Sequence, residues 1–296
     1  MCGIVGLFVK DPALEPRLGT LIAAMLVEMS ERGPDSAGIA VYRNPAGDDA
    51  VKVVLFSHED GYDWAGLAAE IGDVAGLEIR ASHAILTVRG DAETVRGWLH
   101  RHHPELRLMS ADNRIEIFKE KGLPKDVVQR FALAELAGSH AIGHTRMATE
   151  SAVTTEHSHP FSTGMDLCLV HNGSLSNHNR LRQVLRREGG IAIQTDNDSE
   201  VAAGYLTWRM GQGATLPEAL EAGIADLDGF YTFCVGTRDG FAVLRDPIAC
   251  KHAVLAETDG WVAMATEYRA IARLPRAEKA RVWEPAPGRV YSWVRA

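Results

Sequence analysis

The chain has 296 residues, of which 46% are apolar and 24% are charged. These values are typical of a globular protein and exclude a disordered, collagen-like or disulfide-dominated chain. The length accommodates one large domain or two small ones. The formal net charge of -8 is unfavourable for binding to nucleic acid, so we expect no nucleic-acid partner.

The N-terminal residues MCGIVGLFVKDP contain neither the basic segment nor the long apolar segment of a secretory signal. No apolar run reaches the roughly 18 residues of a membrane span. The four cysteines form no C-x-x-C pair, which argues against a zinc knuckle or a redox dithiol. We therefore expect a cytoplasmic protein that has no membrane partner.

In chain order, the first predicted element is a buried strand over residues 2–8. Apolar residues recur at helical spacing over 18–31, which predicts a helix that ends at Gly33-Pro34-Asp35. Two strands are then predicted at 37–43 and 51–57.

The segment 79–119 has the pattern of a strand, a helix and two further strands. Asp91 can accept a hydrogen bond from the first turn of a helix over 92–102. The three strands are predicted at 83–89, 106–109 and 114–118. A helix over 125–137 and a strand over 140–144 follow.

The C-terminal half begins with a strand and three helices. The strand is predicted at 167–171, and the helices at 177–188, at 198–210 and after Thr215. Thr215 and Glu218, with Pro217 between them, form a capping-box pattern. Residues 229–294 alternate short strands with turns. Strands at both ends of the chain, with helices between them, predict a layered α+β fold.

Cys2 is the strongest candidate for a nucleophile. A small residue after the initiator methionine favours removal of that methionine, which would make Cys2 the N-terminus. Its α-amine, with a reference pKa of about 7.7–8.0, could then take the thiol proton and pass it to a leaving amine. The alternative is an inert cysteine in a buried strand, and position alone favours that alternative.

Several short blocks elsewhere favour the nucleophile. Gly3 and Gly6 leave room for backbone close to the thiol. The other blocks are RGPDSAG at 32–38, HTRMAT at 144–149, HPF at 159–161, HNG at 171–173 and TDNDSE at 195–200. In this order they resemble the class II glutamine amidotransferases, which are glutaminase domains of the N-terminal nucleophile hydrolases. The resemblance begins at residue 2 and ends near residue 270.

The resemblance implies a four-layer αββα sandwich and the hydrolysis of L-glutamine to glutamate and ammonia through a thioester on Cys2. It places the oxyanion hole at the Asn172 side chain and the Gly173 N–H, groups that suit a developing negative oxygen. Asn-Gly alone more often forms a tight hairpin turn. Because this pair follows a predicted strand within HNGSLSNH, we favour the oxyanion site.

The same resemblance assigns substrate-binding roles to Arg146, Asp198 and Thr149. A planar guanidinium binds a carboxylate with two hydrogen bonds, and a fixed carboxylate suits an α-ammonium group. Arg146 could instead be a surface residue at a strand end. Asp198 could be a helix N-cap, or serve both purposes, and Asp196 is the lower-ranked alternative for the ammonium site.

Arg32 and His171 are expected in supporting roles. Arg32 lies near the nucleophile in the family pattern and could lower the thiol pKa or brace Asp35. Two further ideas, a Cys–His dyad and a metal site, are raised by His144, His157, His159 and His171. Without a cysteine or carboxylate partner at ligand spacing, we expect structural histidines and no bound metal.

The sequence departs from the family in two places. Met147 and Glu150 replace an aromatic residue and a histidine of simpler relatives, which leaves the shape of the glutamine pocket open. The segment between the RGPDSAG and HTRMAT blocks is also longer than in compact relatives. We therefore expect one amidotransferase domain over 1–296 with an inserted small α/β lobe at about 60–135. A docking surface, a lid and an inert decoration are all open as its role.

The chain contains no P-loop, no G-x-G-x-x-G and no sugar-isomerase pattern. We therefore expect ammonia to pass to a synthase site on a partner chain, and its release is the alternative. Residues 245–271 resemble the stand-alone amidotransferase subunit of N-methylglutamate synthase and of glutamate-synthase-like systems. That resemblance implies a hetero-oligomer with no cofactor on this chain and with any flavin or iron–sulfur centres on partner subunits.

Two alternatives remain open. The first is another N-terminal-cysteine amidohydrolase, such as a bile-salt or penicillin-type acylase. Arg146 with Asp198 argues against it, because an α-amino-acid head needs both charges. The second is a non-catalytic regulatory subunit, and the presence of Cys2, Asn172 and Asp198 argues against that one.

Overall fold

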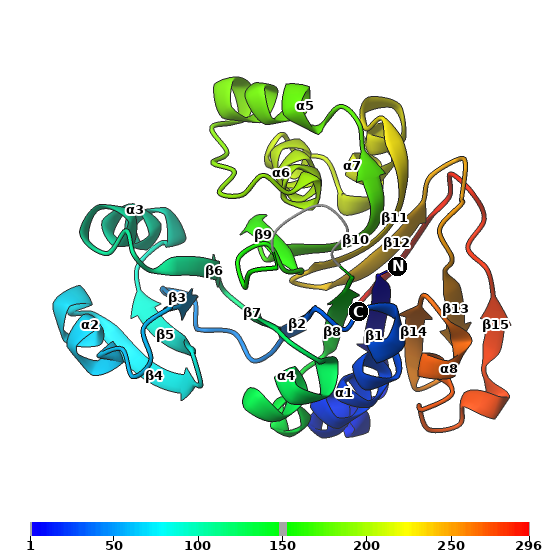
Figure 1. Ribbon diagram of the computed structural model, residues 1–296, viewed down its shortest axis with the longest axis horizontal. Helices are drawn as coiled ribbons and strands as arrows, with labels where there is room; N and C mark the ends of the chain where they lie inside the picture. Colours follow the sequence, from blue (N-terminus) through cyan, green and yellow to red (C-terminus); the bar gives the residue numbers. More distant parts are fainter. Residues whose placement is uncertain (1, 148–152, 296) are drawn as a thin grey trace.

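The computed structural model describes residues 2–147 and 153–295 (Figure 1). Two antiparallel sheets lie against each other, helices cover their outer faces, and a lobe projects from one side of the sandwich. The predicted α+β fold, a four-layer αββα sandwich, is confirmed. No helix within the described residues is long and apolar enough to cross a membrane.

The larger sheet has seven strands, and β1 and β8 lie in its middle. From one edge to the other the strands are β15 (Arg281–Trp283), β13 (Val254–Glu257), β14 (Trp261–Ala265), β1 (Gly3–Val9), β8 (His140–Arg146), β2 (Ser36–Tyr42) and β7 (Ile115–Lys121). Every residue of β1 is buried, as its apolar sequence predicts. Gly3 pairs with Thr145, so the start of β1 lies beside the end of β8.

The smaller sheet has five strands and carries the HNG block. In spatial order they are β16 (Val290–Val294), β12 (Gly240–Arg245), β11 (Gly229–Thr237), β10 (Leu167–Leu175) and β9 (Phe161–Gly164). Strand β10 pairs with β11 over eight successive residues, from Cys168 with Gly236 to Leu175 with Gly229. This long pairing fixes the backbone on both sides of Asn172.

Helices cover both sheets on their outer faces (Figure 1). The seven-stranded sheet is covered by α1 (Leu18–Glu28), α4 (Pro124–Arg130) and α8 (Tyr268–Ile271). The five-stranded sheet is covered by α6 (Asp198–Gly211) and α7 (Leu216–Asp226), and α5 (His178–Val184) packs on α6. Short 3-10 or π turns occur at Pro12–Arg17, Ser30–Arg32, Leu133–Glu135, Leu185–Gly189 and Ala277–Lys279.

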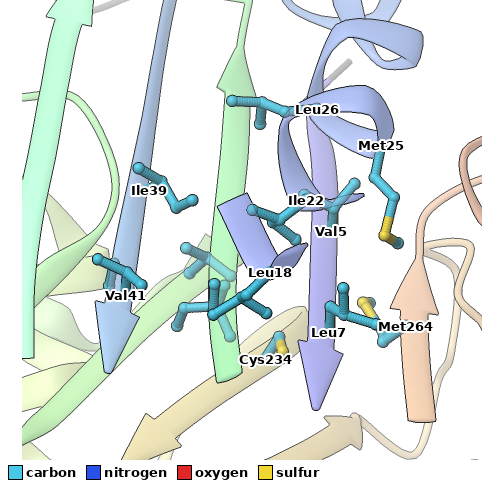
Figure 2. Packing of buried hydrophobic residues seen from close by; sticks show 14 of the residues in the cluster. Val5, Leu7, Leu18, Ile22, Met25, Leu26, Ile39, Val41, Cys234 and Met264 are labelled. Carbon is cyan, nitrogen blue, oxygen red and sulfur yellow. The ribbon is translucent and has the colours of Figure 1, made fainter. Parts of the chain in front are cut away.

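The core is continuous from α1 through the seven-stranded sheet to the inner face of the smaller sheet. Figure 2 shows Leu18 and Ile22 of α1 against Val5 and Leu7 of β1, with Cys234 of the smaller sheet nearby. A second buried cluster joins the outer face of the smaller sheet to α5, α6 and α7. The two clusters stabilise the relative placement of the sheets, and therefore of any groups that the sheets carry.

The lobe has its own sheet, its own helices and its own core (left in Figure 1). Its elements are β4 (Val74–Arg80), β5 (His83–Arg89), β3 (Ala50–Phe56), β6 (Arg107–Asp112), α2 (Trp64–Ile71) and α3 (Ala92–His102). It is narrower than the predicted 60–135 at its C-terminal end, because β7 belongs to the seven-stranded sheet and α4 packs on α1. The division of the chain into a domain and an insertion stays a prediction.

Candidate active site

Cys2 lies where the two sheets approach each other. It immediately precedes β1, and the Asn172 side chain on β10 donates a hydrogen bond from Nδ2 to the Cys2 carbonyl oxygen at 3.2 Å. The Cys2 Sγ lies 4.0 Å from the carbonyl oxygen of Met147. Cys2 is half-buried, whereas Asn172 is buried. The predicted nucleophile and the predicted oxyanion side chain are therefore neighbours, although 170 positions separate them.

Asn172-Gly173 forms no turn, so the hairpin alternative is wrong. Both residues lie within β10 and pair across the sheet with Thr232 and Tyr231. Gly173 has φ +152°, and a Cβ there would lie 2.0 Å from the Phe230 carbonyl oxygen. Glycine is required at this position because a side chain would collide with the neighbouring backbone.

Asp198 is the first residue of α6 and is not its N-cap. That role belongs to Asn197, whose side chain accepts a hydrogen bond from the Ser199 N–H at 2.9 Å. The Asp198 Oδ2 accepts the Leu175 N–H at 2.9 Å, and Oδ1 lies 3.7 Å from His171 Nδ1. Burial raises the pKa of Asp198, but His171 and the Leu175 N–H outweigh burial and lower the pKa to about 2. The carboxylate is therefore ionised at neutral pH.

Arg146 ends β8 next to the start of β1 and is buried. Its carbonyl oxygen accepts the Asp35 N–H at 3.1 Å. A Cβ on Gly33 would lie 2.4 Å from the Arg146 nitrogen, so the RGPDSAG loop packs directly on the end of β8. The surface alternative for Arg146 is wrong, because only 5% of the residue is exposed. Thr149 and Glu150 lie outside the described residues.

Arg32 forms an ion pair with a residue that the sequence reasoning did not single out. Its Nη1 lies 2.8 Å from Glu267 Oε1, and the Arg32 side chain is 15% exposed. Glu267 immediately precedes α8 and also pairs with Arg269 Nε at 2.8 Å. The 235 positions between Arg32 and Glu267 left no local signal for this contact.

Three of the four candidate histidines lie close together, namely His144 of β8, His171 of β10 and His159, which precedes β9. The rings of His144 and His159 stack with their centroids 4.0 Å apart, and His144 Nε2 lies 3.1 Å from the His171 carbonyl oxygen. Burial lowers the pKa of His144 to about 3 and holds the pKa of His159 well below its usual value. Both rings are therefore neutral at pH 7. His157 instead contacts Thr154, with its Nδ1 2.8 Å from Oγ1.

Within residues 2–147 and 153–295, no three His, Cys, Asp or Glu side chains are placed to hold one metal ion. In the same residues, the Cys2 thiol makes its hydrogen-bond contact with a backbone carbonyl rather than with a histidine. The described geometry therefore gives no support to a Cys–His dyad. The expectation that this chain binds no metal or cofactor stays a prediction.

Comparison with known proteins identifies the family. A model of the glutamine amidotransferase domain matches residues 144–273. The chain is 55% identical to glutamine amidotransferase-like protein GlxB of Rhizobium meliloti (strain 1021), over 99% of this chain and 98% of that protein. The chain belongs to the class II glutamine amidotransferase family. A putative glutamine amidotransferase of Methanothermobacter thermautotrophicus is 29% identical, over 98% of this chain and 99% of the relative.

Two solved structures share the fold of this amidotransferase. Glutamine phosphoribosylpyrophosphate amidotransferase from B. subtilis matches 98% of the chain with a TM-score of 0.62 and 20% identity. The allosteric regulatory enzyme of purine biosynthesis matches 98% with a TM-score of 0.64 and 21% identity. The amidotransferase spans less than half of each of these chains, 47% and 46% respectively. The predicted resemblance to the class II family is confirmed.

Ser199 and Glu200, in the first turn of α6, were not among the residues predicted from the sequence. Glu200 is buried and accepts the backbone N–H groups of Gln194 and Thr195 at 2.8 and 2.7 Å. Ser199 is buried between His159 and His171. Their position inside the TDNDSE block was the available signal, because polar residues in the first turn of a helix often bind backbone or site groups.

A cavity of about 420 Å³ lies between the lobe and this loop. His58 and Arg107 line it from the lobe, and Thr195 and Glu200 line it from the loop before α6. His58 Nε2 lies 2.5 Å from Glu156 Oε1 across the cavity. The lobe of the amidotransferase therefore contacts segments that lead into the candidate site.

Proposed function

We propose that this amidotransferase hydrolyses L-glutamine to glutamate and ammonia with Cys2 as the nucleophile. The observation that carries the proposal is the 3.2 Å contact between the Asn172 side-chain amide and the Cys2 carbonyl oxygen. An amide donor fixed beside a nucleophile can stabilise the oxygen of a tetrahedral intermediate. The family supports the same activity, since its matched members are named as glutamine amidotransferases.

The proposed chemistry uses one residue as both nucleophile and base. With Met1 removed, the Cys2 α-amine takes the thiol proton, and the sulfur bonds to the side-chain amide carbon of glutamine. The Asn172 amide and the Gly173 N–H stabilise the resulting oxyanion. The amine then protonates the leaving nitrogen, the C–N bond breaks, and ammonia leaves behind a thioester. Water, deprotonated by the amine, breaks the thioester and releases glutamate and the thiol.

The two charges of the substrate head have one candidate partner each. We assign the glutamine α-carboxylate to Arg146, whose fork of donors suits bidentate binding. We assign the α-ammonium group to Asp198, which is available as an anion because its pKa is about 2. Thr149 is proposed as a third substrate contact. Arg32 and His171 are proposed as supporting residues that hold these groups in place.

The ammonia acceptor is proposed to lie on a partner chain. The resemblance of residues 245–271 to the amidotransferase subunit of N-methylglutamate synthase and of glutamate-synthase-like systems supports this assignment. Any flavin or iron–sulfur centre would then belong to the partner chain. We propose that the complex is cytoplasmic and that the isolated chain hydrolyses glutamine only weakly. Co-purification of tagged chain from its source cell should recover the synthase subunit. Recovery of the chain alone under mild conditions would contradict a stable complex.

The nucleophile assignment predicts that Cys2→Ala abolishes glutamine hydrolysis, by at least about a thousandfold, because no other group supplies the sulfur. Glutamate and ammonia release should be measured for the isolated chain and for its co-purified complex. Cys250→Ala is the matched control, since this exposed cysteine lies outside the proposed machinery. Hydrolysis by Cys2→Ala at the control rate would contradict the proposal. So would an intact mass showing Met1 retained in fully active protein.

A further inference from the structure

A series of buried polar side chains joins the first turn of α6 to β10. Ser199 Oγ lies 2.9 Å from His171 Nδ1 and 2.7 Å from His159 Nε2. All three residues are at most 6% exposed. Ser199 Oγ also donates to Asp198 Oδ1 at 3.3 Å. A hydroxyl donates only one proton, so with that proton donated to Asp198 both imidazoles donate to the Ser199 oxygen. The Ser199 hydroxyl therefore contacts both rings and the Asp198 carboxylate.

This series of side chains is held against the seven-stranded sheet at its His159 end. The His159 ring stacks on His144 of β8, and the His159 carbonyl oxygen would lie 2.2 Å from a Cβ at Gly38 of β2. His159 is thus held by close packing from two neighbouring strands. Ser199 transmits that fixed position to the ring of His171.

The ring of His171 touches both ends of the proposed glutamine site. On one side Nδ1 lies 3.7 Å from Oδ1 of Asp198, the proposed ammonium ligand. On the other side Nε2 would lie 2.8 Å from a Cβ at Gly173, the proposed oxyanion donor. Among the described residues, Nε2 is buried without a hydrogen-bond partner. Packing fills the space around it, and the hydrogen bond at Nδ1 sets its orientation.

We propose that Ser199 and His171 are a positioning pair that fixes the spacing between the Gly173 backbone and the Asp198 carboxylate. This inference rests on the proposed function, because it gives the pair a role in holding both ends of one glutamine. Neither side chain touches a reacting atom. Without the hydroxyl, two buried imidazole nitrogens lose their partner, and the His171 ring loses the contact that orients it.

The test compares Ser199→Ala with Ser199→Thr, which keeps the hydroxyl. Thr207→Ala is the matched control, because Thr207 is a buried hydroxyl of the same helix that bonds Thr163 Oγ1 at 2.7 Å instead. We expect Ser199→Ala to lower kcat/KM for glutamine about 10- to 100-fold, with KM raised and kcat lowered, since small misplacements of bound groups cost about that much. Ser199→Thr should recover most of the loss, and the control should match wild type.

A second readout separates positioning from loss of folding. Both reagents are used on chains that also carry Cys250→Ala, which removes the exposed cysteine. Iodoacetamide then alkylates the Cys2 thiol without needing the amino-acid head, whereas a diazoketone analogue of glutamine needs it. We expect Ser199→Ala to react with iodoacetamide at the wild-type rate but with the analogue at least about tenfold more slowly. Equal slowing with both reagents would overturn the inference, as would unchanged glutamine kinetics in Ser199→Ala. A wild-type complex that neither hydrolyses glutamine nor reacts with the analogue would overturn the proposed function itself.

Discussion

Asp198 remains charged in a partly covered site because the structure supplies hydrogen bonds to its ionised form. Burial alone would raise the pKa of this carboxyl, yet His171 and the Leu175 N–H bring the pKa to about 2 from an ordinary value of 3.8. A pKa lowered by folding means that the folded state binds its proton less readily than the unfolded chain does. The resulting stability is therefore present above pH 4 and is lost as the pH falls towards 2.

This linkage predicts that Asp198→Asn destabilises the protein by about 2 kcal/mol near pH 6, and that the difference from wild type shrinks as the pH falls from 4 towards 2. Denaturant unfolding of both proteins at a series of pH values measures it. Asp196→Asn, a change at an exposed carboxylate two positions earlier, should follow wild type throughout. A difference between Asp198→Asn and wild type that stays constant over this range would refute the linkage.

The sequence indicated Asn172 as a neighbour of Cys2 but not the contacts that hold the candidate site residues in place. Asn172 and Cys2 could be linked because each sits in a recognisable block, and the structure brings them to 3.2 Å. The Arg32–Glu267 ion pair joins a block residue to a residue outside every block, and the Ser199–His171 contact joins two blocks whose relative placement the sequence does not give. Such contacts depend on how two sheets and a helix pack, which local periodicity does not encode.

At the scale of elements, prediction succeeded where a terminus has its own chemical signal. The helix at 92–102 begins and ends as predicted, because Asp91 accepts the Thr94 N–H at 2.9 Å. The capping box of Thr215 and Glu218 also forms. The helix over 125–137 was predicted too long, since Ala132 adopts φ 49° and interrupts it. Strand β4 and helix α2 were missed, and β4 lies mostly exposed at a sheet edge, where apolar alternation is weak.

Strand β2 supports the site through a close approach at Gly38. An added Cβ would lie 2.2 Å from the His159 carbonyl oxygen, which is backbone and cannot move aside as a side chain would. We predict that Gly38→Ala lowers the free energy of unfolding by about 1–3 kcal/mol and also reduces glutaminase activity, because His159 must shift.

Gly97→Ala provides the control for Gly38→Ala. Gly97 lies inside α3, where a Cβ would come no nearer than 3.4 Å to the end of the flexible Arg101 side chain. Alanine there should raise the free energy of unfolding by about 0.5–1 kcal/mol, since it favours the helix, and leave activity unchanged. Thermal or denaturant unfolding measures both substitutions. Equal changes in the free energy of unfolding for Gly38→Ala and Gly97→Ala would show that the close approach at Gly38 does not affect stability.

At the scale of the whole molecule, buried charges attach the lobe to the sandwich. Glu116 of β7 is almost fully buried, and its oxygens contact Lys52 Nζ of β3 at 2.7 Å and Arg43 Nη1 at 2.9 Å. On the lobe, Arg80 donates from Nη1 to the Phe131 carbonyl oxygen at 2.8 Å. These directional contacts join the lobe to the sandwich beside the apolar contacts of the shared core.

The Glu116–Lys52 pair predicts a strong coupling across this junction. Glu116→Gln leaves the Lys52 charge buried without its counter-ion, so we expect a loss of about 3–5 kcal/mol in the free energy of unfolding. Lys52→Met in the same chain removes that uncompensated charge, and the double variant should recover part of the loss. The two single changes should therefore be non-additive by at least about 1 kcal/mol.

A second double-mutant cycle, on an exposed ion pair of the sandwich, tests whether burial causes the strong coupling between Glu116 and Lys52. Lys10 and Glu257 pair at 3.0 Å, but their side chains are 33% and 31% exposed, so water screens both charges. Their coupling should lie between about 0 and 1 kcal/mol and should fall further with added salt. Denaturant unfolding of each single and double variant supplies both cycles. Equal coupling free energies in the two pairs would mean that apolar contacts hold the lobe. A large coupling between Glu116 and Lys52, with a small one between Lys10 and Glu257, would mean that the buried ion pair holds the lobe against the sandwich.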